Sequence, residues 1–262
     1  MRHSINIFLL LFLCAISGCS QDQSGEEIVV TPGLDEKKLH VQSIQLKVSD
    51  EAVARKARSI KRLQAELVPV LNSLPVIETE AESIRRSTEE VANRAMALCV
   101  VAIKGEGVHQ KVIEELIRDF KLQDVLTPKD LTFVNDPSPS VSDRIQFAWC
   151  YECYWVMLLS LGFVDDLGRP DKICDVTMAA GFLHDLGRDG FLQKARLRPQ
   201  SELLDADDLL YRYDWACVNA RIGGQNAPAG LDDEIVLEWH RALNWLVGYF
   251  ENAKWDEVST NT

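Results

Sequence analysis

Two nearby cysteines, Cys150 and Cys153, have the Cys-x-x-Cys spacing of redox and zinc sites. A structural zinc site needs four ligands, usually two such pairs, and the chain has no second Cys-x-x-Cys and no His-x-x-x-His. A redox pair sits at a helix N-terminus, where the dipole lowers the thiol pKa. This pair lies inside an aromatic, apolar run, so we expect a mid-helix position and packing in the core. Redox or metal chemistry is the alternative.

His184 and Asp185 form a step that is typical of metal-dependent phosphohydrolases. Those enzymes complete the metal site with further histidines and a distant aspartate. Beyond the start of the chain, only His40 and His109 stand upstream, and neither lies on a convincing helix face. We interpret the pair as the end of a helix with Gly187 at its C-cap. The chain also lacks a glycine-rich phosphate loop and a serine nucleophile elbow.

Glu152 is unusual because its neighbours are apolar. Residues 147–164 are apolar apart from Glu152, one serine and one glycine, which predicts a central helix with this carboxylate buried. A buried carboxylate without a partner is costly or becomes protonated. We therefore expect a structural ion pair, and a catalytic acid with a raised pKa is the alternative. The expected partners, the likeliest first, are Arg212, Arg94 and Arg221.

Two late segments carry acidic, guanidinium and indole side chains in the same order and at helical spacing. One stripe is Asp208, Arg212, Trp215 and Asn219, and the other is Glu234, Glu238, Arg241 and Trp245. Such a surface suits recognition of a sugar or a peptide end through bidentate and stacking contacts. It equally suits two helices locked together by polar pairs with tryptophan at the seam, which we favour. The candidate binding or structural cluster is Glu152, Asp208, Arg212, Trp215, Glu238, Arg241 and Trp245.

A series of helical segments must position these residues. A capping box, Ser87 to Glu90, opens one helix, and Thr127-Pro128 is typical of another helix start. The sequence predicts an all-α, single-domain bundle of about eight helices, with at most one short strand near the N-terminus, over Val41–Val48. The expected helices cover residues 52–67, 87–105, 108–120, 142–164, 200–222 and 232–250, with two more beginning near 127 and 175.

The first residues have the form of a secretory signal. Arg2 and His3 precede an apolar run from Ile5 to Ile16, which is too short to span a bilayer core of about 30 Å as a helix. The run ends in Ile-Ser-Gly-Cys19, which resembles the bacterial lipobox, whose cysteine is acylated and becomes the new N-terminus. We expect a signal peptide over residues 1–18, a lipidated N-terminus and flexible tether over 19–36, and a helical domain over 37–262. A plain signal peptide and a cytoplasmic protein with an apolar start are the alternatives.

Five cysteines remain besides Cys14, in the signal, and Cys19. An odd number, mostly inside apolar helical runs, favours buried free thiols at least as much as one or two disulfides. These five are Cys99, Cys150, Cys153, Cys174 and Cys217.

Several segments taken together resemble the bacterial domain of unknown function 4272 family, over roughly residues 75–262. They include Arg86-Ser87-x-x-Glu90, Asn93-Arg94-Ala95, Trp149-x-x-Glu152, Cys174-Asp175, Asp208-Leu209-x-Tyr211-Arg212-x-x-Trp215, Glu238-x-x-x-Ala242-Leu243-Asn244-Trp245 and Trp255-Asp256. The resemblance implies a helical domain and carries no established activity. It leads us to expect arginine where Cys150 stands.

The charge of the chain limits the classes of partner. With 28 basic and 40 acidic residues and a net charge of −12, it has no electrostatic footprint for nucleic acid. It would also be repelled from anionic lipid, so membrane contact should come from lipid on Cys19 alone. We expect a module that binds a protein or cell-wall component in the cell envelope and faces the periplasm, with the outer membrane favoured if the bacterium is Gram-negative. We assign no catalytic residue, metal or cofactor. A hydrolytic enzyme using a buried carboxylate such as Glu152, Glu238 or Asp256, and a purely structural envelope protein, are the alternatives.

Overall fold

A computed structural model describes residues 49–260. Within them the chain forms helices joined by turns and loops, without a strand, which confirms the all-α expectation. These residues fall in one unit of the chain, Leu46–Thr262. The signal, Cys19, the tether and the short strand predicted over Val41–Val48 lie outside the described residues. Between residues 49 and 260, no helix has both the length and the apolar character needed to cross a membrane.

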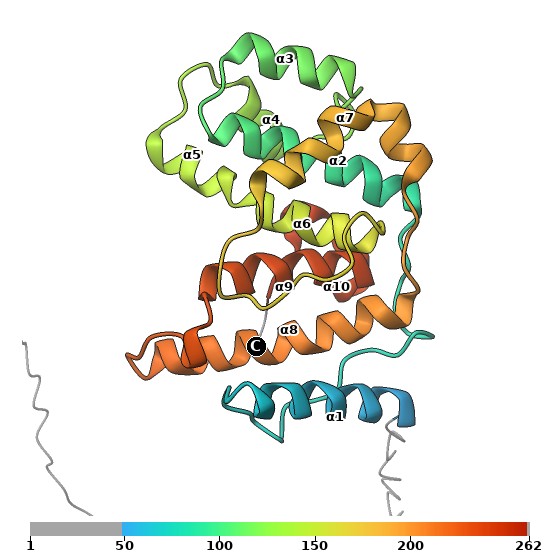
Figure 1. Ribbon diagram of the computed structural model, residues 1–262, viewed down its shortest axis with the longest axis vertical. Helices are drawn as coiled ribbons and strands as arrows, with labels where there is room; N and C mark the ends of the chain where they lie inside the picture. Colours follow the sequence, from blue (N-terminus) through green and yellow to red (C-terminus); the bar gives the residue numbers. More distant parts are fainter. Residues whose placement is uncertain (1–48, 261–262) are drawn as a thin grey trace, which may run out of the picture. The chain divides into compact units, whose positions relative to one another are not determined.

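The helices stack in an order that differs from their order in the chain (Figure 1). Helix α8 packs between α1 and α9, then α6 packs between α9 and α2. Helices α3, α5 and α7 cover α2 at the end of the unit farthest from α1 (Figure 1). The bounds are α1 Asp50–Ala65, α2 Thr88–Gly105, α3 Gln110–Asp119, α4 Pro128–Asn135, α5 Val141–Ala148, α6 Cys150–Ser160, α7 Val176–Lys194, α8 Gln200–Ile222, α9 Asp233–Val247 and α10 Tyr249–Asn252, with 3-10 turns η1 Pro228–Gly230 and η2 Trp255–Glu257.

Local signals begin several helices where the sequence indicates. The Ser87 hydroxyl accepts the backbone N–H of Glu90 at 3.1 Å, and the Glu90 carboxylate accepts that of Ser87 at 2.8 Å. Thr127 caps α4 in the same way, and the Asp175 carboxylate accepts the N–H of Met178 at the start of α7. These caps satisfy N–H groups that have no partner within the helix.

The single helix expected over residues 142–164 is two helices. Helix α5 ends at Ala148 and α6 begins at Cys150, with Trp149 between them. Nearly every residue of α6 is buried, whereas no residue of α5 is. The apolar run therefore belongs to α6, and the amphipathic residues before it form a separate helix packed on α2.

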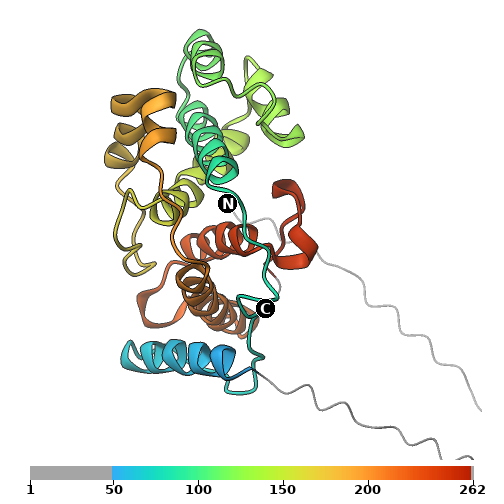
Figure 2. The same cartoon turned by 90° about the vertical axis from the view of Figure 1, so that its right-hand side faces the viewer.

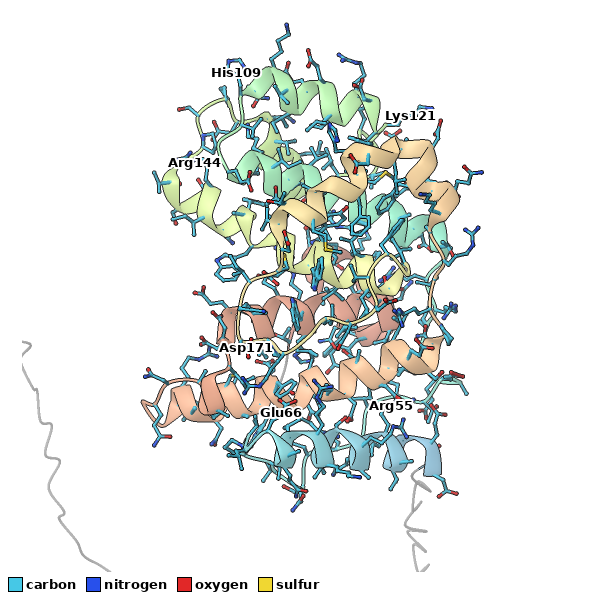
Figure 3. The ribbon with its side chains drawn as sticks, in the orientation of Figure 1. Arg55, Glu66, His109, Lys121, Arg144 and Asp171 are labelled. Atoms are coloured by element: carbon cyan, nitrogen blue, oxygen red, sulfur yellow. The ribbon has the colours of Figure 1, made fainter. Side chains whose placement is uncertain are left out.

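The segment between α1 and α2, residues 67–86, crosses the molecule without helix; we call it the strap. Figure 2 shows it passing α8 and α9 on its way to α2. Basic side chains hold its carbonyl oxygens: Arg55 donates to Glu78 O at 3.0 Å and Arg212 donates to Pro75 O at 3.1 Å. Arg55 and Glu66 also reach from α1 toward α8 (Figure 3), where Glu66 accepts the Tyr213 hydroxyl at 2.5 Å. The strap is therefore fixed over the α8–α9 layer.

Candidate functional site

Glu152 is buried in α6 as expected, with 2% of its surface exposed, but no arginine reaches it. One carboxylate oxygen accepts the backbone N–H of Cys174 at 2.8 Å, and the other accepts the indole N–H of Trp239 at 2.8 Å. Burial raises the pKa of Glu152, and these two neutral donors act in the opposite direction. The predicted ion pair with Arg212 is therefore wrong.

The three arginines proposed as partners pair with acidic residues closer to them. Arg212 forms two hydrogen bonds, at 2.9 and 2.7 Å, with Asp208 one turn earlier on α8. The guanidinium of Arg94 bonds Asp130, at the start of α4, at 2.5 and 3.3 Å. Arg221 is exposed near the end of α8, 3.9 Å from Asp233. For Arg212, Asp208 lies four residues away on the same helix and is available without any long-range packing. Asp208 therefore takes precedence over Glu152 as its partner.

The cysteine pair stands at the first turn of α6, not in the middle of a helix. Burial nevertheless raises the pKa of Cys150 to about 12 and that of Cys153 well above its ordinary value. The Cys153 thiol donates to the Glu238 carboxylate at 2.9 Å. All five cysteines in the described residues are free and buried. Core packing is therefore the role that the geometry supports for this pair.

His184 and Asp185 lie on the exposed side of α7, with their side chains 2.9 Å apart. Gly187 has a positive φ of 59° and kinks the helix, which then continues to Lys194. Residues 49–260 contain no group of three or more His, Cys, Asp or Glu side chains arranged to hold a metal ion. The exposed pair has no such neighbours to complete a metal site.

The two stripes do not meet on one surface. Asp208 and Arg212 are buried as a pair beneath the strap, and Trp215 is only half-buried on α8. In the second stripe, on α9, the side chains of Arg241 and Trp245 lie against Trp255, in the turn at η2. The seven residues predicted as one cluster are thus divided between the α6 core, helix α8 and the surroundings of Trp255.

Trp255 is the centre of the densest arginine–tryptophan cluster in the described residues. Its ring lies edge-on to Trp245, with centroids 5.6 Å apart. The guanidinium carbons of Arg94 and Arg241 lie 4.5 and 4.8 Å from its ring centroid, and that of Arg86 lies 3.9 Å from the ring of Trp245. Such stacking is favourable by about 0.5–2 kcal/mol for each pair. Both indoles are buried, so their faces are not platforms for a sugar ring.

Two cavities, of about 510 and 220 Å³, are both lined by Trp255 and Asp256; together we call them the Trp255 cleft. Their lining combines basic and acidic side chains. The basic ones are Arg86, Arg94, Lys129, Arg241 and Lys254, and the acidic ones are Glu90, Asp130, Glu238, Asp256 and Glu257. A lining with both basic and acidic side chains suits a ligand that carries both negatively and positively charged groups.

Arg241 differs from its neighbours in how its donors are used. Arg86 donates to the carbonyl oxygens of Trp245 and Ala253, at 2.6 and 3.0 Å, and Arg94 is bonded to Asp130. No hydrogen bond from the Arg241 guanidinium to a residue within 49–260 is formed, and a Glu238 oxygen lies 3.6 Å from its Nη1. Stacking on Trp255 therefore positions a guanidinium whose donors are not taken up by the described protein.

The stripe pattern found Glu238, Arg241 and Trp245 but missed the residue that joins them. Trp255 and Asp256 both belong to the family resemblance, and Asp256 is also one of the possible catalytic acids. Arg86 and Trp255 lie far apart in the chain, so helical spacing cannot connect them. The one signal in the sequence is the abundance of tryptophan near the C-terminus. It does not indicate which residues these side chains contact.

A family model described as Domain of unknown function (DUF4272) matches residues 55–258. The match begins earlier than the expected residue 75, so it includes most of α1 and the whole strap. Comparisons with curated proteins and with solved structures found no match.

Proposed function

The chain belongs to the DUF4272 family, a domain of unknown function, and we propose that it is a lipid-anchored binding module of the bacterial cell envelope. In this proposal lipid on Cys19 holds the protein to a membrane. The Trp255 cleft takes a carboxylate-bearing end of a protein or of a cell-wall peptide. The lipobox-like residues before Cys19 support the anchor, and the geometry around Arg241 supports the ligand.

The observation that carries the ligand class is the guanidinium of Arg241. It is held on the face of Trp255 and lines a cavity of about 220 Å³ without a hydrogen bond to a described residue. A guanidinium presents its N–H groups as a planar fork that matches both oxygens of a carboxylate. Stacking fixes the fork in advance, so binding costs less conformational entropy.

The charges around the cleft favour a peptide end over a simple anion. Glu90, Asp256 and Glu257 line the larger cavity and would repel a ligand that carries only negative charge. A peptide can place its carboxylate near Arg241 and present N–H groups or a basic side chain to these acids. The net charge of −12 also favours capture of a basic partner at long range.

A titration of the full-length chain with acetyl-Ala-Ala, as the free acid and as the C-terminal amide, tests this function. We expect the acid to bind and Arg241→Gln to weaken it about tenfold to a hundredfold, because a charge-assisted hydrogen bond contributes about 1.5–3 kcal/mol. The change is read from calorimetry and from tryptophan fluorescence. Arg118→Gln, on the exposed side of α3, is the matched control.

Three results would argue against the carboxylate site. The amide could bind as tightly as the acid, Arg241→Gln could bind like the wild type, or neither peptide could bind. Circular dichroism and the unfolding midpoint of Arg241→Gln show whether a loss of binding is only a loss of folding.

Glu152 supports a second candidate, a hydrolytic enzyme. Its carboxyl group lines an apolar cavity of about 280 Å³ beside Trp149 and Tyr151, and burial raises its pKa. A carboxyl group with a raised pKa can act as a general acid near neutral pH. This candidate requires turnover that Glu152→Gln abolishes and Arg241→Gln leaves intact, which separates it from the binding module.

A further inference from the structure

A third cavity, of about 110 Å³, lies between the strap and the α8–α9 layer. Strap residues Pro75 to Glu78 form one wall, and Asp207 and Tyr211 from α8 form another. His240, Asn244 and Tyr249 complete the lining. This cavity shares no lining residue with the Trp255 cleft, so it is a separate site.

Asp207 is the acid in this cavity that lacks a partner. It is only 2% exposed, and its Oδ1 forms no hydrogen bond to any described residue. Its neighbours on α8 differ, because Asp205 is paired with Arg55 and Arg58, and Asp208 is paired with Arg212. Most buried polar groups in proteins have a partner, so a buried carboxyl group without one, in the wall of a cavity, indicates a missing donor.

The surrounding charges show that the missing donor should be a cation. Glu78 and Asp208 both act to raise the pKa of Asp207, after burial, which is the main cause. Arg55 acts in the opposite direction, but its three guanidinium nitrogens are bonded to Asp205, Glu78 O and Glu51. No described basic side chain therefore serves as the counter-ion of Asp207.

The other lining groups suit a small ammonium ion. Tyr211 and Tyr249 provide aromatic rings, and Asn244 lines the wall while its amide donates to Ser259 O at 2.9 Å. His240 is held at Nδ1 by Asp214 at 2.8 Å, so that acid is already occupied. Aromatic rings and a carboxylate together recognise ammonium groups. Pro75, Val76 and Ile77 offer apolar contact to a short alkyl chain.

We propose that the cavity beneath the strap binds a small primary alkylammonium ion, with the Asp207 carboxylate as its counter-ion. The ammonium donates an N–H to the Asp207 carboxylate. Because the ion requires an ionised carboxylate, any proton that Asp207 holds is released to solvent on binding. The charged and titratable groups around Asp207 are Glu78 from the strap, Arg55 from α1, Asp208 and Tyr211 from α8, His240 from α9 and Tyr249 from α10. Arg212 is paired with Asp208.

The test is a calorimetric titration of the full-length chain with ethylammonium, with ethanol and propionate as neutral and anionic probes of similar size. We expect only ethylammonium to bind, and Asp207→Asn to weaken its binding at least about tenfold. The affinity should rise as pH increases through the raised pKa of Asp207, since alkylammonium itself stays charged to about pH 10. Proton release is measured by repeating the titration in buffers of different ionisation enthalpy.

Asn resembles a protonated Asp in shape, so Asp207→Asn should fold, and its unfolding midpoint checks this. Asp189→Asn, on an exposed carboxylate, is the matched control and should bind ethylammonium normally. Arg241→Gln should also bind it normally, which separates this site from the proposed peptide cleft. The proposal is overturned if ethylammonium fails to bind at millimolar concentration, if ethanol binds equally well, or if Asp207→Asn retains the wild-type affinity.

Discussion

The buried acids of this protein differ in the groups that bond to them. Asp130 and Asp208 are paired with arginine, at 2.5 and 2.7 Å. Glu152 accepts two neutral N–H donors, and Asp207 has an oxygen without any partner in the described residues. Because burial raises the pKa of Glu152 and of Asp207, these two are the groups whose protonation should depend on ligands and pH.

Replacing Glu152 with alanine should destabilise the protein by about 2–6 kcal/mol, since two buried donors lose their acceptor at about 1–3 kcal/mol each. These donors are the indole N–H of Trp239 and the backbone N–H of Cys174. Urea denaturation measures the loss. Glu89→Ala, an exposed acid in the first turn of α2, should cost no more than about 1 kcal/mol. Equal stability of the two variants would mean that water replaces the carboxylate.

The pH dependence of stability should change when Asp207 becomes asparagine. The pKa of Asp207 is raised in the folded state, so the folded protein binds the proton more tightly than the unfolded chain. This group therefore contributes stability at low pH, which is lost as pH rises above its unfolded pKa of about 3.9. The stability of Asp207→Asn relative to wild type should increase from acidic to neutral pH in denaturant titrations. A constant difference across this range would show that the carboxyl group is not perturbed.

At the scale of the elements, a close helix contact lies beside the division between α5 and α6. The end of α2 meets the end of α5 at Gly105, where a Cβ atom would lie 2.7 Å from Ala148 N and 2.8 Å from Arg144 O. Such distances leave no room for a side chain. The glycine thus allows two backbones to approach where the chain turns from the exposed α5 into the buried α6.

Gly105→Ala should therefore separate these helices and destabilise the protein by about 1–3 kcal/mol, as overpacking does. Gly181→Ala on α7 is the matched control, because a Cβ there would meet nothing within 4 Å. That change should be neutral or stabilising by up to about 1 kcal/mol, through helix propensity. Thermal or urea unfolding of both variants tests the contact, and equal effects would contradict it.

At the scale of the whole molecule, the proposed function depends on where an acidic protein places its arginines. The chain carries a net charge of −12, yet Arg86, Arg94 and Arg241 gather around two tryptophans. Anchoring by lipid would hold such a protein at a membrane that its own charge repels. The proposed anchor and the Trp255 cleft are thus independent parts with separate tests.

Replacing Cys19 with serine should block lipid attachment and leave the unprocessed precursor, because the thiol is the nucleophile that accepts the lipid. Metabolic labelling with a fatty acid, together with detergent partitioning, measures both effects. Cys99→Ser, which changes a buried thiol of α2, is the control. The fraction of this variant that folds should be labelled like the wild type. Continued cleavage after Gly18 and unchanged partitioning of Cys19→Ser would rule out the lipoprotein assignment.

The sequence by itself determined most of the helices, though not the break between α5 and α6, because helix signals act over a few residues. Ser87 and Glu90 are three residues apart, and Asp175 caps the turn that follows it. The apolar run around Glu152 likewise predicted its burial correctly. Hydrophobic periodicity and capping are local properties of the chain, so one sequence is enough to read them.

Only the tertiary structure decided which side chains meet. Glu152 bonds Trp239, 87 residues away, instead of an arginine, and Trp255 joins arginines from α2 and α9. A long-range contact depends on how helices cross and on which partner is already occupied nearby. Helical spacing carries no information on either, so the stripes predicted charged faces but not the cleft. The cavity at Asp207 was missed for the same reason, since its opposite wall is the non-helical strap.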